Sequence, residues 1–138
     1  MAKRVLIVDD HAPTRALIRS VLEAEKGASF AIVEASTGME CLKAADAKGP
    51  FDLILLDVNL PDMDGFEICK ALRNVDKGVP IVFVTAKTDL KDFAAGRAAG
   101  GDSYLVKPIA RAALRSMVGL FTNMARRPAD DTRSAGKA

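Results

Sequence analysis

Five short apolar runs recur along the chain, each followed by a longer stretch with helical periodicity. The runs cover residues 5–8, 30–33, 53–56, 81–84 and 104–106. They are rich in β-branched residues, and their apolar positions follow one another without polar residues between them. Strands that are covered on both faces have this pattern, so the runs predict five strands of a parallel sheet.

The stretches between the runs carry apolar residues at the spacing of amphipathic helices. Four helices are marked in this way, by Leu17, Ile18, Val21 and Leu22; by Ile68, Cys69 and Leu72; by Leu90, Phe93 and Ala94; and by Leu114, Met117, Val118 and Phe121. The remaining helix is marked by a capping box, with Thr37 as the N-cap and Glu40 reaching back. We also expect Thr88 to cap the fourth helix and Pro108 to lie near the first turn of the fifth.

Strand and helix therefore alternate five times, which predicts an α/β fold. It consists of a doubly wound, five-stranded parallel sheet with five helices on its two faces. We place a single domain at residues 1–124, because a chain of 138 residues suits one domain of ordinary size. Residues 125–138 contain no large apolar side chain, so we expect them to form a polar, disordered tail or linker.

Composition narrows the possible functions. Hydrophobic residues make up 49% of the chain, and the net charge of +2 is too small to argue for direct binding of nucleic acid or of an acidic membrane. Asp9 and Asp10 interrupt the first apolar run, so we expect neither an export signal nor insertion into a membrane. Cys41 and Cys69 fit no metal-binding motif, which favours two reduced, buried thiols in a cytoplasmic protein.

Polar residues with chemical potential stand where the predicted strands end. Asp9 and Asp10 follow the first strand, Asp57 the third, Thr85 the fourth and Lys107 the fifth. In a parallel sheet these ends share one edge, and open α/β sheets bind ligands there, where the strand order reverses. Each residue alone has an ordinary structural explanation, but five of them at strand ends favour a functional site.

Three converging carboxylates would repel one another, and one would take up a proton unless a cation lay among them. Hard oxygen ligands suit Mg²⁺, which keeps several waters and leaves room for a phosphate oxygen. The backbone carbonyl of Asn59 could supply a further oxygen. A carboxylate beside this ion can accept a phosphoryl group, while Lys107 and the Thr85 hydroxyl stabilise the phosphoryl oxygens.

From Lys3 to Met124 the sequence resembles the response-regulator receiver family of two-component signalling. Four motifs carry the resemblance: VLIVDD at 5–10, LLDVNLPDMDG at 55–65, VTA at 84–86 and GGDSYLVKP at 100–108. The family implies a flavodoxin-like fold with strand order 2-1-3-4-5 and a cis bond between Lys107 and Pro108. It also implies a signalling module rather than an enzyme, one that catalyses only its own Mg²⁺-dependent phosphorylation and dephosphorylation.

The resemblance assigns a role to each acidic residue of the site. Asp57 accepts a phosphoryl group from a histidine kinase, a histidine phosphotransfer protein or a small donor such as acetyl phosphate. Asp10, Asp57 and the backbone carbonyl of Asn59 coordinate Mg²⁺ or Mn²⁺, and Asp9 contributes through water.

The resemblance also implies a conformational switch. Thr85 and Lys107 bind the phosphoryl group, and Tyr104 turns inward when Thr85 moves toward it. The change reaches a downstream protein target through the face of the fourth helix and fifth strand. Phe93, Ala94 and Arg97, with Tyr104 nearby, are candidates for this surface, and ordinary helix packing is the alternative explanation for them. We expect a monomer or a weak, phosphorylation-dependent dimer, and either a stand-alone receiver or a fragment of a longer regulator.

Two other functions compete with this interpretation. A phosphatase of the haloacid-dehalogenase type also forms an aspartyl phosphate, but it has an acid two residues after the nucleophile, where this chain has Asn59. A nucleotide or flavin binding module fits the predicted fold, but the turn after the first strand lacks phosphate-cradling glycines. His11, the only histidine, is expected to be a loop residue at the mouth of the pocket rather than a second phosphorylation site.

Overall fold

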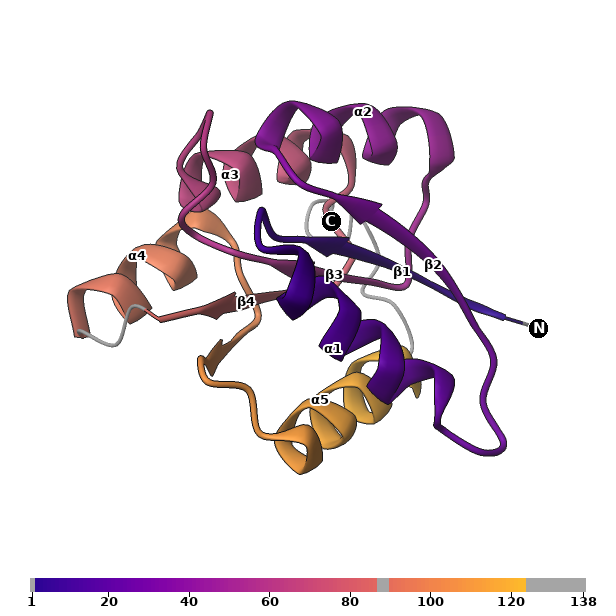
Figure 1. Cartoon of the computed structure of the whole chain (residues 1–138). Coiled ribbons are helices and arrows are strands. Elements are labelled where there is room, and N and C mark those ends of the chain that lie inside the picture. The colour runs from indigo at the N-terminus through magenta and orange to yellow at the C-terminus, as the bar shows by residue number, and fades with distance from the viewer. Residues whose placement is uncertain (1, 87–89, 124–138) are drawn as a thin grey trace, which may run out of the picture.

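The computed structural model describes residues 2–86 and 90–123, and within them five strands alternate with five helices (Figure 1). The strands are β1 (Lys3–Val8), β2 (Phe30–Ala35), β3 (Leu53–Leu56), β4 (Ile81–Thr85) and β5 (Ser103–Val106). The helices are α1 (Ala12–Glu23), α2 (Gly38–Lys48), α3 (Gly65–Val75), α4 (Leu90–Ala99) and α5 (Arg111–Asn123). All strand pairs are parallel, in the order β2-β1-β3-β4-β5, which confirms the predicted doubly wound sheet.

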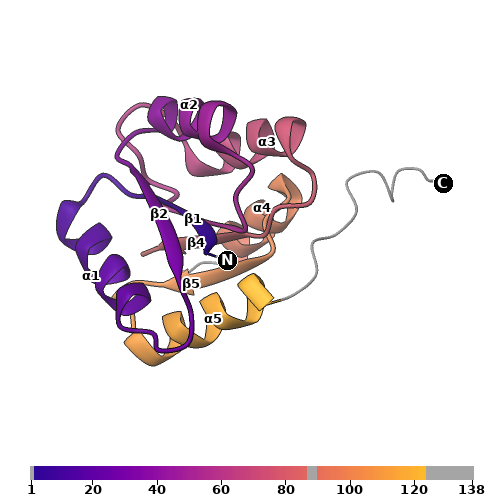
Figure 2. The ribbon, with the colours of Figure 1, turned by 90° about the vertical axis from the view of Figure 1, so that its right-hand side faces the viewer.

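Two hydrophobic clusters, one on each face of the sheet, explain why the strands are apolar at successive positions. α1 and α5 cover one face, and α2, α3 and α4 cover the other (Figure 2). Successive strand residues point to opposite faces, so Val5 and Ile7 join the first cluster while Leu6 and Val8 join the second. Because both faces are covered, polar side chains concentrate at the strand ends.

The strand register sets where those ends lie. β1 and β3 end level with each other, since Val8 pairs with Leu56 and the Asp57 amide donates to the Val8 carbonyl at 2.9 Å. β4 and β5 also end together, with Thr85 paired to Val106. The residues that follow the strands therefore meet at one edge of the sheet, as the sequence predicted.

The start of α2 agrees with the predicted capping box only in part. Thr37 Oγ1 accepts a hydrogen bond from the Glu40 amide at 3.0 Å, which confirms Thr37 as the N-cap. The Glu40 carboxylate, however, accepts from the Ser36 amide at 2.7 Å and from the Ser36 hydroxyl at 3.0 Å. Glu40 thus reaches back as predicted, but to Ser36 instead of the N-cap, because two donors on Ser36 hold the carboxylate one residue further out.

The start of α5 agrees with the expectation. α5 begins at Arg111, so Pro108 lies near its first turn, three residues before the helix begins. The Lys107 amide still donates to the Thr85 carbonyl at 2.9 Å, which keeps the chain at the sheet edge up to this point. The bond between Lys107 and Pro108 is cis, as the resemblance implied. Thr88, the predicted cap of α4, lies outside the described residues.

The two cysteines are buried free thiols, as predicted. Cys41 lies in α2 and Cys69 in α3. Burial raises the pKa of Cys41 to about 12 and that of Cys69 to about 11, so both remain protonated and unreactive at neutral pH. None of the helices in the described ranges is long and apolar enough to cross a membrane.

Arg73, near the end of α3, ties the start of β4 to the loop before β5. Its guanidinium donates to the Gly100 carbonyl at 2.8 Å and to the Val79 carbonyl at 2.6 Å, and it pairs with Asp102 at 2.9 Å. Asp102 in turn accepts from the Ile81 amide at 2.9 Å. The two charged side chains are only 15% and 13% exposed, so they depend on each other more than on water.

Replacing Arg73 with alanine is expected to lower the free energy of unfolding by about 2–3 kcal/mol, because it leaves a half-buried carboxylate and three carbonyls, those of Asp76, Val79 and Gly100, without their cationic donor. Urea unfolding measures this loss. Lys70→Ala is the matched control on the same helix, since Lys70 is 57% exposed and, among the residues that the structure describes, pairs only with Glu67 at 3.3 Å. Lys70→Ala should lower the free energy of unfolding by less than about 0.5 kcal/mol. An equal decrease in the free energy of unfolding in the two variants would contradict a special stabilising role of the Arg73 contacts.

Candidate functional site

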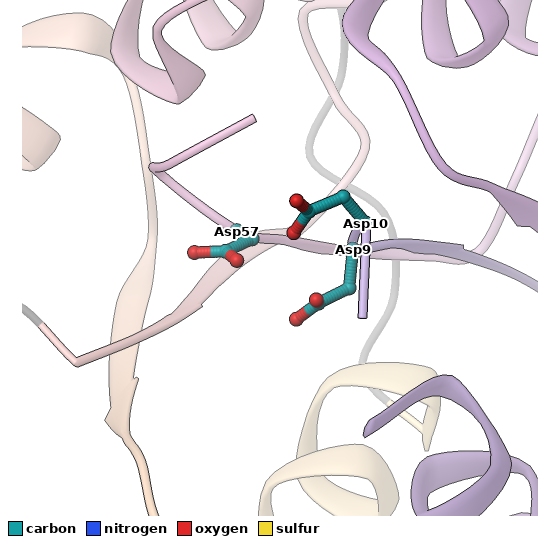
Figure 3. Close-up of side chains that lie close together, drawn as sticks. All are labelled: Asp9, Asp10 and Asp57. Atoms are coloured by element: carbon teal, nitrogen blue, oxygen red, sulfur yellow. The ribbon is translucent and has the colours of Figure 1, made fainter. Parts of the chain in front are cut away.

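Three aspartates gather at the edge of the sheet where β1 and β3 end (Figure 3). Asp9 and Asp10 follow β1 and Asp57 follows β3, and these two strands are neighbours. One carboxylate oxygen from each aspartate lies within 4.8 Å of the others. Asp9 and Asp57 are buried while Asp10 is exposed, so solvent reaches the cluster at Asp10.

The Asp57 carboxylate is held between a backbone amide and a lysine. Asp57 is 4% exposed; its Oδ1 accepts from the Asn59 amide at 3.2 Å, and its Oδ2 accepts from Lys107 Nζ at 3.1 Å. Burial and then the charge of Asp9 raise the pKa of Asp57, and Lys107 and the Asn59 amide offset this only in part. The carboxylate is therefore well positioned, but its negative charge is incompletely compensated.

Asp9 is held by the loop that begins α1 and by the same lysine. Its Oδ1 accepts from the His11 amide at 2.9 Å, and its Oδ2 lies 2.7 Å from Lys107 Nζ. Burial by itself would lower the pKa of Lys107, but the contacts with Asp9 and Asp57 outweigh this effect and raise it. Lys107 therefore stays charged and bridges the two buried carboxylates.

The cluster fits a divalent cation with a preference for hard oxygen ligands. Three carboxylates against one ammonium leave an excess of two negative charges, which at this separation calls for a counter-ion or a proton. Asp9 Oδ2 is buried, and among the described residues it accepts no hydrogen bond of ordinary geometry, even though Lys107 lies close to it. A buried anionic oxygen with free lone pairs, beside two further carboxylates, is a suitable ligand set for such an ion.

Thr85 and Tyr104 lie on the two strands beyond β3. Thr85 ends β4 and is fully buried. The Tyr104 ring on β5 packs edge to face on Phe93 of α4, with ring centroids 4.5 Å apart, and contacts Phe83 of β4 at 5.7 Å. Its hydroxyl is buried with no hydrogen-bond partner in the part of the chain that the structure describes, and burial raises its pKa to about 12. Tyr104 thus links β5 to α4.

His11 is an exposed residue directly before α1, as predicted. Its Nδ1 lies 2.8 Å from Thr14 Oγ1, and its amide holds the Asp9 carboxylate. The His11 side chain therefore contacts the first turn of α1, while its backbone amide binds a carboxylate of the acidic cluster.

Two polar side chains near the site make contacts that were not found from the sequence. Arg15 Nη1 donates to the Asp9 carbonyl at 2.7 Å. Asp62, in the loop after β3, accepts from the amides of Gly38 at 2.7 Å and Met39 at 3.0 Å at the start of α2, and these bonds lower its pKa. Arg15 looks like ordinary surface charge on an amphipathic helix, and the partners of Asp62 are too far away in the sequence for a local motif.

The fold and the site together define a class of protein: a doubly wound α/β domain with an acidic cation site where its strand order reverses. The family model of the response regulator receiver domain matches residues 5–119. The chain belongs to the response-regulator receiver family, whose members are phospho-accepting signalling modules rather than classical enzymes. This membership decides against the phosphatase and the nucleotide-binding module.

Known relatives agree with this assignment. The DNA-binding response regulator MtrA of Mycolicibacterium paratuberculosis is 42% identical over 108 residues, which cover 78% of this chain and 46% of that protein. A CheY-like receiver domain protein from Methanospirillum hungatei JF-1 has a TM-score of 0.80 at 28% identity, covering 89% of this chain and 95% of that one. Chemotaxis protein CheY4 of Vibrio cholerae has a TM-score of 0.79 at 33% identity, covering 88% and 99%. The match thus spans less than half of the curated relative but nearly all of the two receiver structures.

Asp57→Asn is expected to stabilise the cation-free domain at neutral pH. Because the pKa of Asp57 is raised on folding, the folded state binds this proton more tightly than the unfolded state does. Ionisation therefore lowers stability above the folded-state pKa, and this loss is absent below the ordinary value of 3.8. The gain in the free energy of unfolding should be full above the raised pKa, decline as the pH falls through it and vanish below 3.8. Urea unfolding with a chelator present, at several pH values, measures it.

Asp62→Asn is the matched control for this prediction, with the opposite expected sign. The Gly38 and Met39 amides lower the pKa of Asp62, so its ionised form stabilises the fold above its ordinary pKa. The substitution should therefore reduce stability at pH 7. A loss of stability at pH 7 in Asp57→Asn as well would show that the site is not electrostatically strained.

Proposed function

We propose that Asp57 is the phosphoryl acceptor of this receiver and that Lys107 and Thr85 bind the phosphoryl group. The observation that carries the proposal is the position of Asp57, a buried carboxylate at the end of β3 with Lys107 Nζ 3.1 Å from its Oδ2. It shares one cluster with Asp9 and Asp10. The nucleophile, the cation-binding acids and the phosphate-binding lysine thus lie together at one edge of the sheet.

The proposed reaction is a transfer from a phosphohistidine to the Asp57 carboxylate. One carboxylate oxygen attacks phosphorus in line with the N–P bond, so that an O–P bond forms while the N–P bond breaks. The imidazole leaves with the electron pair of the broken bond, and Asp57 becomes an acyl phosphate. Such a transfer depends mainly on placement and on neutralising the phosphoryl oxygens, which Lys107 and the Thr85 hydroxyl provide.

We infer that the cation is Mg²⁺, with Mn²⁺ as its substitute. Asp10, Asp57 and the backbone carbonyl of Asn59 would hold it, and Asp9 would contribute through water. When bound, the ion supplies positive charge that neutralises both the acids and the phosphoryl oxygens. Two backbone interactions hold Asn59 beside the site and support its inclusion among the cation ligands. The Asn59 amide donates to the Asp57 carboxylate, and Asn59 forms an antiparallel bridge with Asp64.

Membership of the family implies a histidine kinase partner. We propose that the phosphoryl group comes from the kinase directly or through a histidine phosphotransfer protein, with acetyl phosphate as a small substitute. We assign the receiver to residues 1–124 and place the protein in the cytoplasm. Residues 125–138, for which the sequence predicts a polar tail or linker, lie outside the described residues. MtrA is named as DNA-binding, but this chain spans less than half of that protein, and we propose no direct contact of the receiver with nucleic acid.

The proposed output is a change of the α4–β5 face, where a downstream protein would bind. Thr85 moves toward the phosphoryl group, and Tyr104 turns into the space that this movement opens. The packing of Tyr104 on Phe93 supports this route, because a change in the tyrosine ring alters the surface of α4. We expect a monomer or a weak dimer that forms on phosphorylation.

Acetyl phosphate is expected to add the mass of one phosphoryl group to the wild-type chain when Mg²⁺ is present, because Asp57 is the nucleophile and the acids need a counter-ion. Intact-protein mass spectrometry measures the gain. Asp57→Asn should gain nothing, since an amide is no nucleophile at neutral pH, whereas Asp62→Asn, five residues away, should label like the wild type. Labelling of Asp57→Asn to the wild-type extent would contradict the assignment of the acceptor.

Thr85→Ala is expected to accept the phosphoryl group but to lose the conformational response. Tyr104 is the only tyrosine and the chain has no tryptophan, so intrinsic fluorescence reports on Tyr104 alone. Acetyl phosphate with Mg²⁺ should change the wild-type emission and leave that of Thr85→Ala nearly unchanged at equal labelling.

Thr122→Ala is the control for this experiment, because Thr122 is also a buried threonine but lies in α5 and donates to the Val118 carbonyl at 2.7 Å. It should respond like the wild type. A normal fluorescence change in labelled Thr85→Ala would contradict the proposed switch while leaving Asp57 as the acceptor.

A further inference from the structure

Arg15, on the first turns of α1, connects the acidic cluster to the edge strand β2. Its Nη1 donates to the Asp9 carbonyl at 2.7 Å, and its Nε donates to Glu34 Oε1 at 2.9 Å. The side chain is 19% exposed, so it is largely covered for an arginine. The two bonds use different nitrogens of one planar group, which fixes the Asp9 carbonyl relative to Glu34.

The carbonyl that Arg15 holds belongs to the peptide that joins Asp9 to Asp10. A peptide is planar, so fixing its oxygen also fixes the direction in which the chain enters Asp10. Asp10 needs such help, because it is exposed and its carboxylate has no hydrogen bond or ion pair within the described residues. Asp9, by contrast, is held through its own carboxylate by the His11 amide and Lys107.

We propose that Arg15, anchored by Glu34, is a positioning residue that orients Asp10 toward the divalent cation. The inference rests on the proposed function, since it assumes that Asp10 binds Mg²⁺. Arg15 itself touches neither the cation nor the phosphoryl group. Its effect passes through the Asp9–Asp10 peptide, and the preceding Val8–Asp9 peptide is tethered as well, by the bond from the Asp9 amide to the Ala35 carbonyl at 3.0 Å.

A simpler explanation is that Arg15 only fastens α1 to β2 through an ion pair. Arg19 already does this, since its Nε lies 2.8 Å and its Nη2 2.7 Å from Glu34 Oε2, and it also contacts Glu23 at 3.4 Å. Arg19 belongs to the same helix and shares the same acid, but within the described part of the chain it makes no hydrogen bond or ion pair with the acidic cluster. It is therefore a matched control for Arg15.

The test is the affinity of the full chain for Mg²⁺, measured by calorimetry and by the NMR amide signal of Asp10. Arg15→Ala should weaken binding about two- to tenfold, the range that one hydrogen bond supplies. Arg19→Ala should bind like the wild type. The direction of the change in Mg²⁺ affinity is informative, because removing the positive charge of Arg15 near a cation site would by itself strengthen Mg²⁺ binding.

Two further variants keep the test decisive. Arg15→Lys retains the charge but has one nitrogen in place of the guanidinium fork, so it should also bind Mg²⁺ more weakly than the wild type, and it serves if Arg15→Ala does not fold. Glu34→Gln weakens the ion pair that anchors Arg15. It should therefore also weaken Mg²⁺ binding, but by less than Arg15→Ala does.

Unchanged or tighter binding in the Arg15 variants would overturn the positioning role and leave the proposed function intact. A wild-type chain that binds no Mg²⁺ would overturn both. Weaker binding in Arg15→Ala and Arg19→Ala alike would overturn the positioning role and assign the effect to the attachment of α1.

Discussion

The close approach of two buried carboxylates, Asp9 and Asp57, is the constraint on which the rest of this structure depends. Burial disfavours the charged form of Asp57 and the nearby charge of Asp9 adds to this cost, so both raise the pKa of Asp57. Lys107 offsets part of it by standing within 3.1 Å of both carboxylates. The remaining excess of negative charge is what makes this edge of the sheet a cation site, so the electrostatic strain and the function have one origin.

The fold maintains this unfavourable arrangement by making it a consequence of backbone pairing. β1 and β3 are adjacent and end at the same level, and the Asp57 amide is itself bonded to the Val8 carbonyl. Apolar clusters on both faces hold these strands, so the acids cannot separate without exposing core residues. The free energy gained by burying the strands therefore keeps the charges together.

The sequence predicted the parts of the site that depend on local order along the chain. Apolar runs ending in Asp9, Asp57 and Thr85 were visible because a parallel sheet places all its strand ends at one edge. The contact between Arg15 and Asp9 was not visible, because it depends on how α1 lies against β2. The return bond from Glu40 to Ser36 was missed because the motif allows a neighbouring donor to compete. The positions of the acidic residues can therefore be predicted from the sequence, whereas the contacts that hold them depend on how the helices pack on the sheet.

Tyr104 offers a physical reason why the site could communicate with a distant surface. Its hydroxyl is buried without a hydrogen-bond partner among the described residues, and such a group costs free energy that another ring position could recover. The ring also rests on Phe93 of α4, so its movement cannot leave that helix surface unchanged. A side chain that is already unfavourably placed needs only a small bias to move. Thr85 ends β4, which lies between β5 and the strand before Asp57, the proposed phosphoryl acceptor, and so can supply that bias from the same edge of the sheet.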